Sequence, residues 1–144
     1  MTTQMTSRLT TGTPASPPSR ALRIASVAAL VFGAMTVVSG GSVLFGPAHV
    51  RTAAGDVVPF VLWFNFLAGF AYIAAAAGLW RGAPWARGLS MVILGATVLA
   101  GAGFLIHVLT GGAFAQRTVG ALVLRMGFWG VIVGLLVRTG RAAR

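Results

Sequence analysis

Hydrophobic residues gather into four continuous runs along this chain, separated by short segments that contain glycine, proline or arginine. The runs cover residues 21–45, 57–80, 89–109 and 119–137. A helix rises about 1.5 Å per residue, so about 20 apolar residues cross a hydrocarbon layer about 30 Å thick. Each run is long enough for one crossing. The pattern predicts an all-α protein, a four-helix transmembrane bundle over residues 21–137.

Composition supports a membrane protein. The chain is 57% hydrophobic and 8% charged, which is too apolar for a water-soluble core of this size. It has no cysteine, which excludes disulfides, thiol redox chemistry and iron–sulfur ligation. A net charge of +10 would favour nucleic acid as the partner of a soluble protein. Here the arginines lie between and beyond the apolar runs, so we expect a lipid bilayer as the partner and no nucleic acid.

The arginines also predict the orientation. Eight of them lie before the first run, between the second and third runs, or after the fourth: Arg8, Arg20, Arg23, Arg81, Arg87, Arg138, Arg141 and Arg144. Only Arg51 and Arg117 lie in the other two loops. Short cytoplasmic loops carry the excess of positive charge, so both termini are expected in the cytoplasm. Arginine without lysine, beside abundant alanine and glycine, indicates a bacterial protein of the cytoplasmic (inner) membrane.

The segments outside the runs have simple expectations. Residues 1–20 are rich in threonine, serine and proline and should be disordered, and residues 138–144 should form a basic cytoplasmic tail. The segment 81–87 contains Gly82 and Pro84 and should be a tight hairpin. An alternative takes the first run as a signal peptide cleaved near Ala48, although the run is longer than the typical apolar region of about 7–15 residues.

Three strongly polar side chains lie inside the runs: Asn65, His107 and Arg125. Counted from the outer end of each run, they lie about 12, about 4 and about 9 Å deep. We therefore predict one polar pocket that opens to the outer side, with Tyr72 below it and Asp56 or Arg117 at its mouth. The predicted ligand-binding residues are Asn65, Tyr72, His107, Arg125, Asp56 and Arg117.

Helical spacing supports this pocket in part. Two series share the spacing i, i+4, i+7, i+11: Asn65, Gly69, Tyr72 and Ala76 in the second run, and Ala96, Ala100, Gly103 and His107 in the third. Small residues let membrane helices approach closely, so both faces should point into the bundle.

The fourth run has two different faces. Gly127, Gly130 and Gly134 form a helix-packing face, and Arg125 lies roughly opposite. An unpaired arginine in lipid costs about 2.5–3.5 kcal/mol on insertion scales, so we expect Arg125 to point inward. The glycine face is then left for another helix, in a homo-oligomer or in a partner membrane subunit.

Each polar residue also has a simpler interpretation. Asn65 can serve as a hydrogen bond between helices, and His107 can be solvated near the membrane surface. Arg125 can extend its guanidinium to the outer headgroups. The sequence leaves these alternatives open.

The predicted pocket contains hydrogen-bond donors and no carboxylate. This disfavours proton-coupled cation transport, and it disfavours zinc or di-iron hydrolytic sites, so no metal and no resident cofactor are expected. An anion fits better: a phospholipid headgroup, a carboxylate, a phosphate, or the carbonyl of a quinone. Haem held by His49 and His107 is a further alternative.

In length, in four-run outline over residues 21–137 and in expected orientation, the chain resembles the DoxX-like group of small bacterial membrane proteins. That resemblance implies an accessory role beside membrane redox complexes. The function expected overall is a non-enzymatic accessory or interaction subunit with an outward-facing pocket for an anionic or quinone-like ligand. The alternatives are a small oligomeric anion transporter or channel, and a haem- or quinone-binding redox protein.

Overall fold

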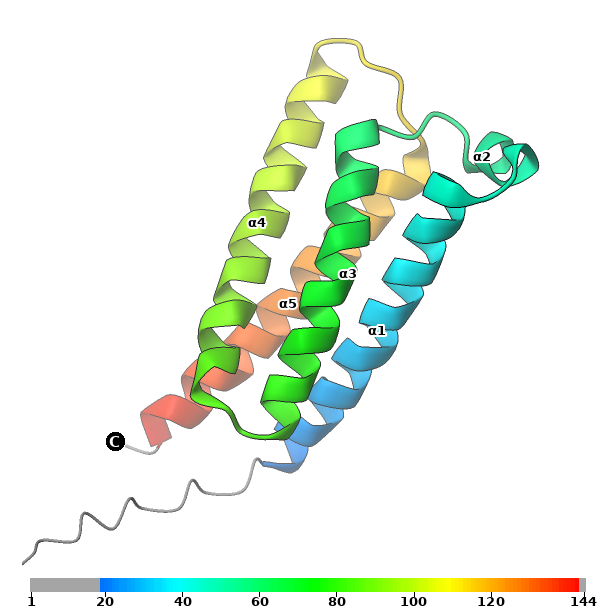
Figure 1. Ribbon diagram of the computed structural model, residues 1–144. Helices are drawn as coiled ribbons and strands as arrows, with labels where there is room; N and C mark the ends of the chain where they lie inside the picture. Colours follow the sequence, from blue (N-terminus) through cyan, green and yellow to red (C-terminus); the bar gives the residue numbers. More distant parts are fainter. Residues whose placement is uncertain (1–18, 143–144) are drawn as a thin grey trace, which may run out of the picture.

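The computed structural model describes residues 19–142 and contains five helices in that part of the chain. They are α1 (Arg20–Phe45), α2 (Ala48–Ala54), α3 (Pro59–Trp80), α4 (Pro84–Leu109) and α5 (Gln116–Ala142). The four long helices run alternately up and down, and α1 begins at the end of the bundle where α5 finishes (Figure 1). We call this the terminal end. The short α2 lies at the opposite end, which we call the α2 end.

The four long helices are each long and apolar enough to cross a membrane. The prediction of an all-α, four-helix transmembrane bundle is therefore confirmed. Large apolar side chains cover the outside of the bundle, among them Val38, Leu99 and Val131, which are 64–74% exposed. In water such a surface would drive aggregation, whereas in a bilayer it contacts lipid chains.

The closest pair of helices is α1 and α3, which meet through glycines. A Cβ atom added to Gly33 would lie 3.0 Å from the carbonyl oxygen of Gly69, and one added to Gly69 would lie 2.7 Å from Cγ2 of Val37. Either substitution would push the two backbones apart. Membrane helices have no hydrophobic driving force between them, so this close approach is what supplies their packing energy.

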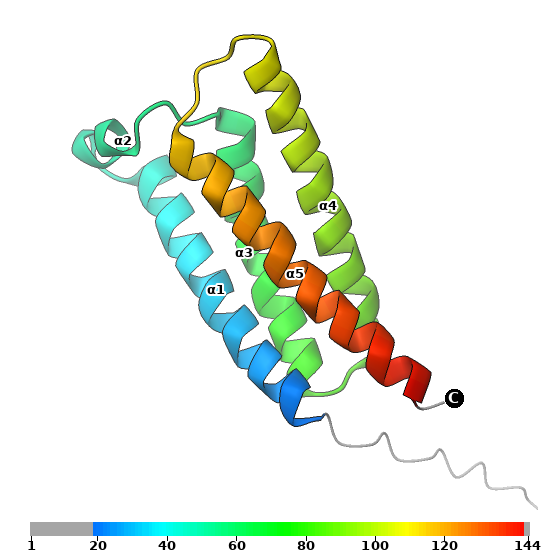
Figure 2. The ribbon, with the colours of Figure 1, turned by 180° about the vertical axis from the view of Figure 1, so that it is seen from behind.

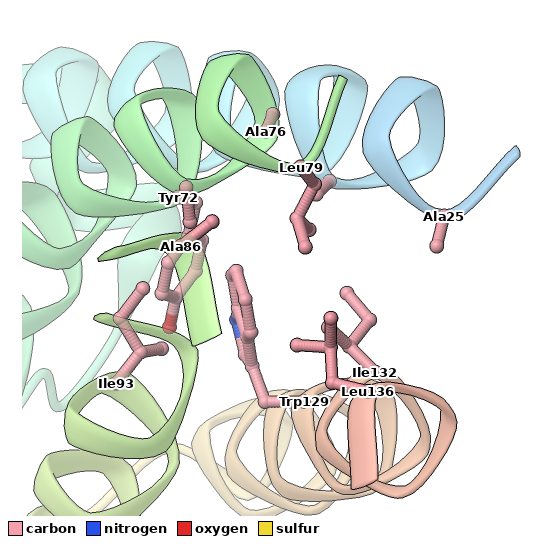
Figure 3. Close-up of a cluster of buried hydrophobic side chains, with 11 residues drawn as sticks. Ala25, Tyr72, Ala76, Leu79, Ala86, Ile93, Trp129, Ile132 and Leu136 are labelled. Carbon is pink, nitrogen blue, oxygen red and sulfur yellow. The ribbon is translucent and has the colours of Figure 1, made fainter. Parts of the chain in front are cut away.

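Aromatic side chains fill the middle of the bundle. Tyr72 and Trp129 are fully buried, and their ring centroids lie 5.0 Å apart between α3, α4 and α5 (Figure 3). Phe32 stacks on Tyr72 at 5.8 Å and contacts Phe128 at 5.0 Å. We call Phe32, Tyr72, Phe128 and Trp129 the aromatic layer. Toward the terminal end, Leu79, Ile132 and Leu136 continue the core below this layer.

The turn between α3 and α4 is shorter than the sequence predicts. It consists of Arg81–Ala83, with Gly82 at a φ of 64°, and Pro84 is already the first residue of α4. Proline suits that position because its fixed φ is helical and the first N–H of a helix needs no partner. Near the terminal end, Arg87 of α4 donates a hydrogen bond from Nη2 to the carbonyl oxygen of Leu136, at 2.6 Å, and links α4 to α5.

Three other segments differ from the prediction or lie mostly outside the residues that the structure describes. The loop between the first two runs contains α2, a helix of seven residues that is too short to give a visible apolar period. Helix α5 continues to Ala142, through most of the segment expected to be a basic tail. The predicted disorder of residues 1–20 concerns mainly residues outside the described part; of the two inside it, Ser19 accepts a hydrogen bond from Leu22 N and Arg20 begins α1.

Candidate functional site

A cavity of about 290 Å³ lies between α1, α3 and α5 in the half of the bundle nearer the α2 end. Its volume is close to the lower limit of ligand pockets, about 300 Å³. We call it the Arg125 cavity. Its polar lining residues are Thr36, Ser39, Asn65, Arg117, Thr118 and Arg125, and the rest of the lining is small or aliphatic.

The segment around α2 forms the upper wall of this cavity. Ala54, Val57 and Val58 contribute to the lining, and two hydrogen bonds tie this segment to the start of α5. Ala115 N donates to the carbonyl oxygen of Asp56 at 2.8 Å, and Arg117 Nη2 donates to that of Ala53 at 3.0 Å. The exposed Arg117 therefore has a visible structural role at the edge of the cavity.

Arg125 is the most unusual residue of the site. It is only 7% exposed, yet its Nε and Nη1 atoms have no hydrogen-bond partner. Its Cζ atom lies 5.9 Å from the ring centroid of Phe32, which gives the cation one favourable neighbour. Buried donors almost always have partners, so two unpartnered atoms on one buried guanidinium call for a functional explanation.

Asn65 faces the same cavity from α3. Its side chain is half-buried, and its Oδ1 atom has no partner. Thr36 lines the opposite wall from α1 and is 3% exposed. Beneath the cavity, Tyr72 Oη and Trp129 Nε1 also lack partners. In the part of the chain that the structure describes, all buried unpartnered side-chain atoms thus belong to this site or to the aromatic layer below it.

These atoms are mostly donors. Three of them, on Arg125 and Trp129, can only donate, and Asn65 Oδ1 alone can only accept. The only acidic side chain in the sequence, Asp56, is exposed and is not part of the cavity lining. The cavity is therefore cationic, with more donors than acceptors, and is chemically suited to an oxyanion or a carbonyl oxygen.

The structure brings together some of the residues predicted from the sequence and separates others. Asn65, Arg117 and Arg125 line one cavity, and Tyr72 lies below it in the aromatic layer. His107 and Asp56 do not line it. His107 is half-buried, and its Nε2 atom lies 3.1 Å from the carbonyl oxygen of Ala113 in the turn after α4. The pocket expected to include the imidazole therefore forms without it.

The reason lies in the rotation of α4. The series Ala96, Ala100, Gly103 and His107, which is predicted to face the bundle interior, is only partly buried. The inward face instead carries Ser90, Ile93, Thr97 and Phe104. Ser90 and Thr97 can be buried because their hydroxyls donate to Ala86 O and Ile93 O of their own helix, each at 2.8 Å.

The histidines considered for haem lie on two different helices of the fold. His49 is on α2, beside the end of α1, and His107 is near the end of α4. Figures 1 and 2 show α2 and the end of α4 on opposite sides of α3. Among the described residues, no group of three or more histidine, cysteine or acidic side chains could hold a metal ion. Haem binding by this pair stays an untested prediction.

Helix α5 presents its glycines away from the cavity. Gly127, Gly130 and Gly134 are exposed, and a Cβ atom added to any of them would have no atom within 4 Å. Arg125 on the same helix is buried. The helix thus has the rotation expected from its sequence, with the guanidinium inward and the glycines outward.

Comparison of the chain with protein-family models, with curated proteins and with solved structures finds no match. The class of the protein therefore follows from its own fold. It is a small multi-pass membrane protein, because four apolar helices of membrane-spanning length make up the bundle.

Proposed function

We propose that this protein is a membrane-embedded accessory or interaction subunit, and that it binds an anionic or quinone-like ligand in the Arg125 cavity. The observation that carries the proposal is the buried Arg125 side chain, with Nε and Nη1 unpartnered at a cavity of about 290 Å³. A charge buried without a partner is costly, and a bound oxyanion would supply the missing acceptors. The outline shared with DoxX-like proteins agrees with an accessory role.

Two neighbouring groups support the same ligand class. Arg117 adds a second guanidinium at the cavity, and Asn65 Oδ1 could accept from a hydroxyl of the ligand. An anion at Arg125 would also be attracted by the positive charge of Arg117 at the edge of the cavity, whereas a neutral quinone would gain only hydrogen bonds to its carbonyl oxygens. The charge balance of the cavity therefore favours the anion.

A binding site is better supported than a transport path. The aromatic layer lies under the cavity, and its Tyr72 and Trp129 are fully buried. Passage of an anion would require these rings to move apart. The transporter interpretation is tested by measuring chloride and phosphate flux in liposomes that contain the purified protein, and we expect no flux above that of empty liposomes.

The ligand class is tested by thermal denaturation of the protein in a neutral maltoside detergent. The probes are dodecyl phosphate, laurate, dodecanol and a decyl-substituted quinone, which compare an anionic, a neutral and a carbonyl headgroup. We expect the two anions to raise the melting temperature of the wild type and to lose this effect in Arg125→Gln. Equal stabilisation by dodecanol would contradict the proposal, and stabilisation by the quinone alone would favour the redox alternative.

The outward glycines of α5 support the second half of the proposal, an interaction with another membrane helix. Gly127, Gly130 and Gly134 give a surface on which a second backbone can approach closely. The partner helix belongs to a second copy of this chain or to another subunit.

A further inference from the structure

The Arg125 cavity is one part of a longer feature, the line along which α1 and α5 face each other. We call this line the α1–α5 seam. The two helices run antiparallel (Figure 2). Thr36 of α1 and Arg125 of α5 line one hollow between them, and Ala25 and Ile132 line another. The seam is open to the outside of the bundle, because Ser39 of α1 and Ile24 of α1 line its two hollows and are exposed.

A second hollow lies on the same seam toward the terminal end. Its volume is about 330 Å³, and its lining is almost entirely apolar: Ala21, Ile24, Ala25, Phe128, Val131, Ile132 and Leu135. We call it the seam groove. Ile24 and Val131 are 71% and 64% exposed, so the groove is open to the surrounding lipid rather than enclosed.

The two hollows are joined by direct side-chain contacts. Arg125 Cζ lies 5.9 Å from the ring centroid of Phe32. The ring centroids of Phe32 and Phe128 lie 5.0 Å apart, and Phe128 lines the seam groove. The last lining residue of the groove, Leu135, is ten residues after Arg125, or about 15 Å along the helix axis. A cationic, donor-rich cavity is thus followed along one open seam by an apolar groove.

The Arg125 cavity also reaches the outside of the bundle along this seam. Ser39 of α1 and Arg117 of α5 line it and are exposed, whereas α4 contributes no lining residue. A ligand that diffuses in the membrane can therefore approach between α1 and α5 without crossing the aqueous surface.

From this arrangement we propose that the ligand is a membrane lipid with an anionic head, a phosphate or a carboxylate, which enters sideways between α1 and α5. Its head binds at Arg125, within the positive field of Arg117 at the edge of the cavity, and its acyl chain lies across Phe32 and Phe128 in the seam groove. Charge and polarity match along the whole ligand, since both arginines lie at one end and apolar side chains line the other. This inference rests on the proposed function and adds the source and the route of the ligand.

The test compares three probes by native mass spectrometry of the full-length protein released from maltoside micelles. Lysophosphatidic acid has both the phosphate and the chain, glycerol 3-phosphate has only the phosphate, and the monoacylglycerol of the same chain length lacks the phosphate. We expect lysophosphatidic acid to bind at least tenfold more tightly than either of the others. Arg125→Gln should weaken it at least tenfold, because hydrogen bonds to a charged group are lost.

A matched pair of variants tests the route. Val131→Trp would fill the seam groove, whereas Val92→Trp places the same ring on α4, away from both hollows. The two valines are 64% and 66% exposed, so the substitutions perturb the lipid-facing surface equally. We expect Val131→Trp to weaken the binding of lysophosphatidic acid at least fivefold and Val92→Trp to leave its binding unchanged.

The outcomes separate this inference from the proposed function. If glycerol 3-phosphate binds as tightly as lysophosphatidic acid, the cavity binds anions but the lipid inference is wrong. If the monoacylglycerol binds as tightly, or if neither phosphate binds, both proposals fail. Equal effects of the two tryptophan variants would show that the chain lies elsewhere and would overturn the route.

Discussion

Replacing Arg125 by methionine should stabilise the protein in the absence of ligand. The wild-type side chain buries two donors without partners, and each such donor costs about 1–3 kcal/mol. Its contact with Phe32 returns about 0.5–2 kcal/mol. Methionine has a similar length, keeps the apolar packing and has no donor to satisfy. We therefore expect a gain of about 2 kcal/mol in the free energy of unfolding.

The assay is reversible unfolding in mixed micelles, where maltoside is exchanged stepwise for dodecyl sulfate and the loss of structure is followed by tryptophan fluorescence. Trp129 reports on the bundle interior because it is fully buried beside Tyr72. Added lysophosphatidic acid should reverse the order of stability, because only the wild type gains binding energy.

Arg87→Met is the matched control, since it removes a guanidinium that has a partner. Arg87 Nη2 donates to Leu136 O at 2.6 Å, so its loss should destabilise the protein by about 0.5–1.5 kcal/mol. The two substitutions should therefore have opposite signs. If Arg125→Met destabilises the ligand-free protein as much as Arg87→Met does, then Arg125 has a structural role, and the reasoning from its unpartnered atoms is wrong.

Three further predictions concern packing, assembly and orientation. Gly69→Ala should lower the free energy of unfolding by about 1–3 kcal/mol, because the added Cβ would meet Val37. Gly95→Ala is the control: its added Cβ would have no atom within 4 Å, so stability should stay unchanged or rise slightly. Gly130→Leu with Gly134→Leu should reduce self-association or retention of a partner on size-exclusion chromatography while the monomer stays folded, and an unchanged profile would mean that lipid covers this face. Reporter fusions after Arg144 and within residues 51–56 should label opposite sides of the membrane, with the C-terminal fusion in the cytoplasm; labelling on one side would contradict the arrangement of the spans.

The fold could be predicted because it depends on a few strong constraints. Four apolar runs of sufficient length can only become membrane helices, and short loops make sequential neighbours antiparallel. The rotation of α5 was also predictable. Turning Arg125 into the bundle and the glycines toward lipid costs less free energy than placing the arginine in lipid. The short α2 was not, because seven residues carry no measurable periodicity.

The site was predicted in part, and the misses have physical causes. Depth along each helix places Asn65 and Arg125 at a similar level, and both residues line one cavity in the structure. Depth says nothing about rotation, and the small residues of α4 do not show which of its faces is fully buried, so the sequence groups His107 with residues whose cavity it does not line. Thr36 is not among the predicted site residues, although it lies on the same face of α1 as Gly33 and Gly40 and is buried with them. A threonine between close-packing glycines was the available signal.

The central claim is that the unpartnered donors of Arg125 bind an oxyanion, and arginine side-chain NMR tests it most directly. All 11 basic residues are arginines, so labelling arginine at Nε gives a small set of resonances to follow. Comparison with Arg125→Lys assigns the Arg125 signal. We expect lysophosphatidic acid to shift this resonance strongly in the wild type, as a charge-assisted hydrogen bond forms at Nε. A resonance that stays in place while lipid is bound would contradict the account.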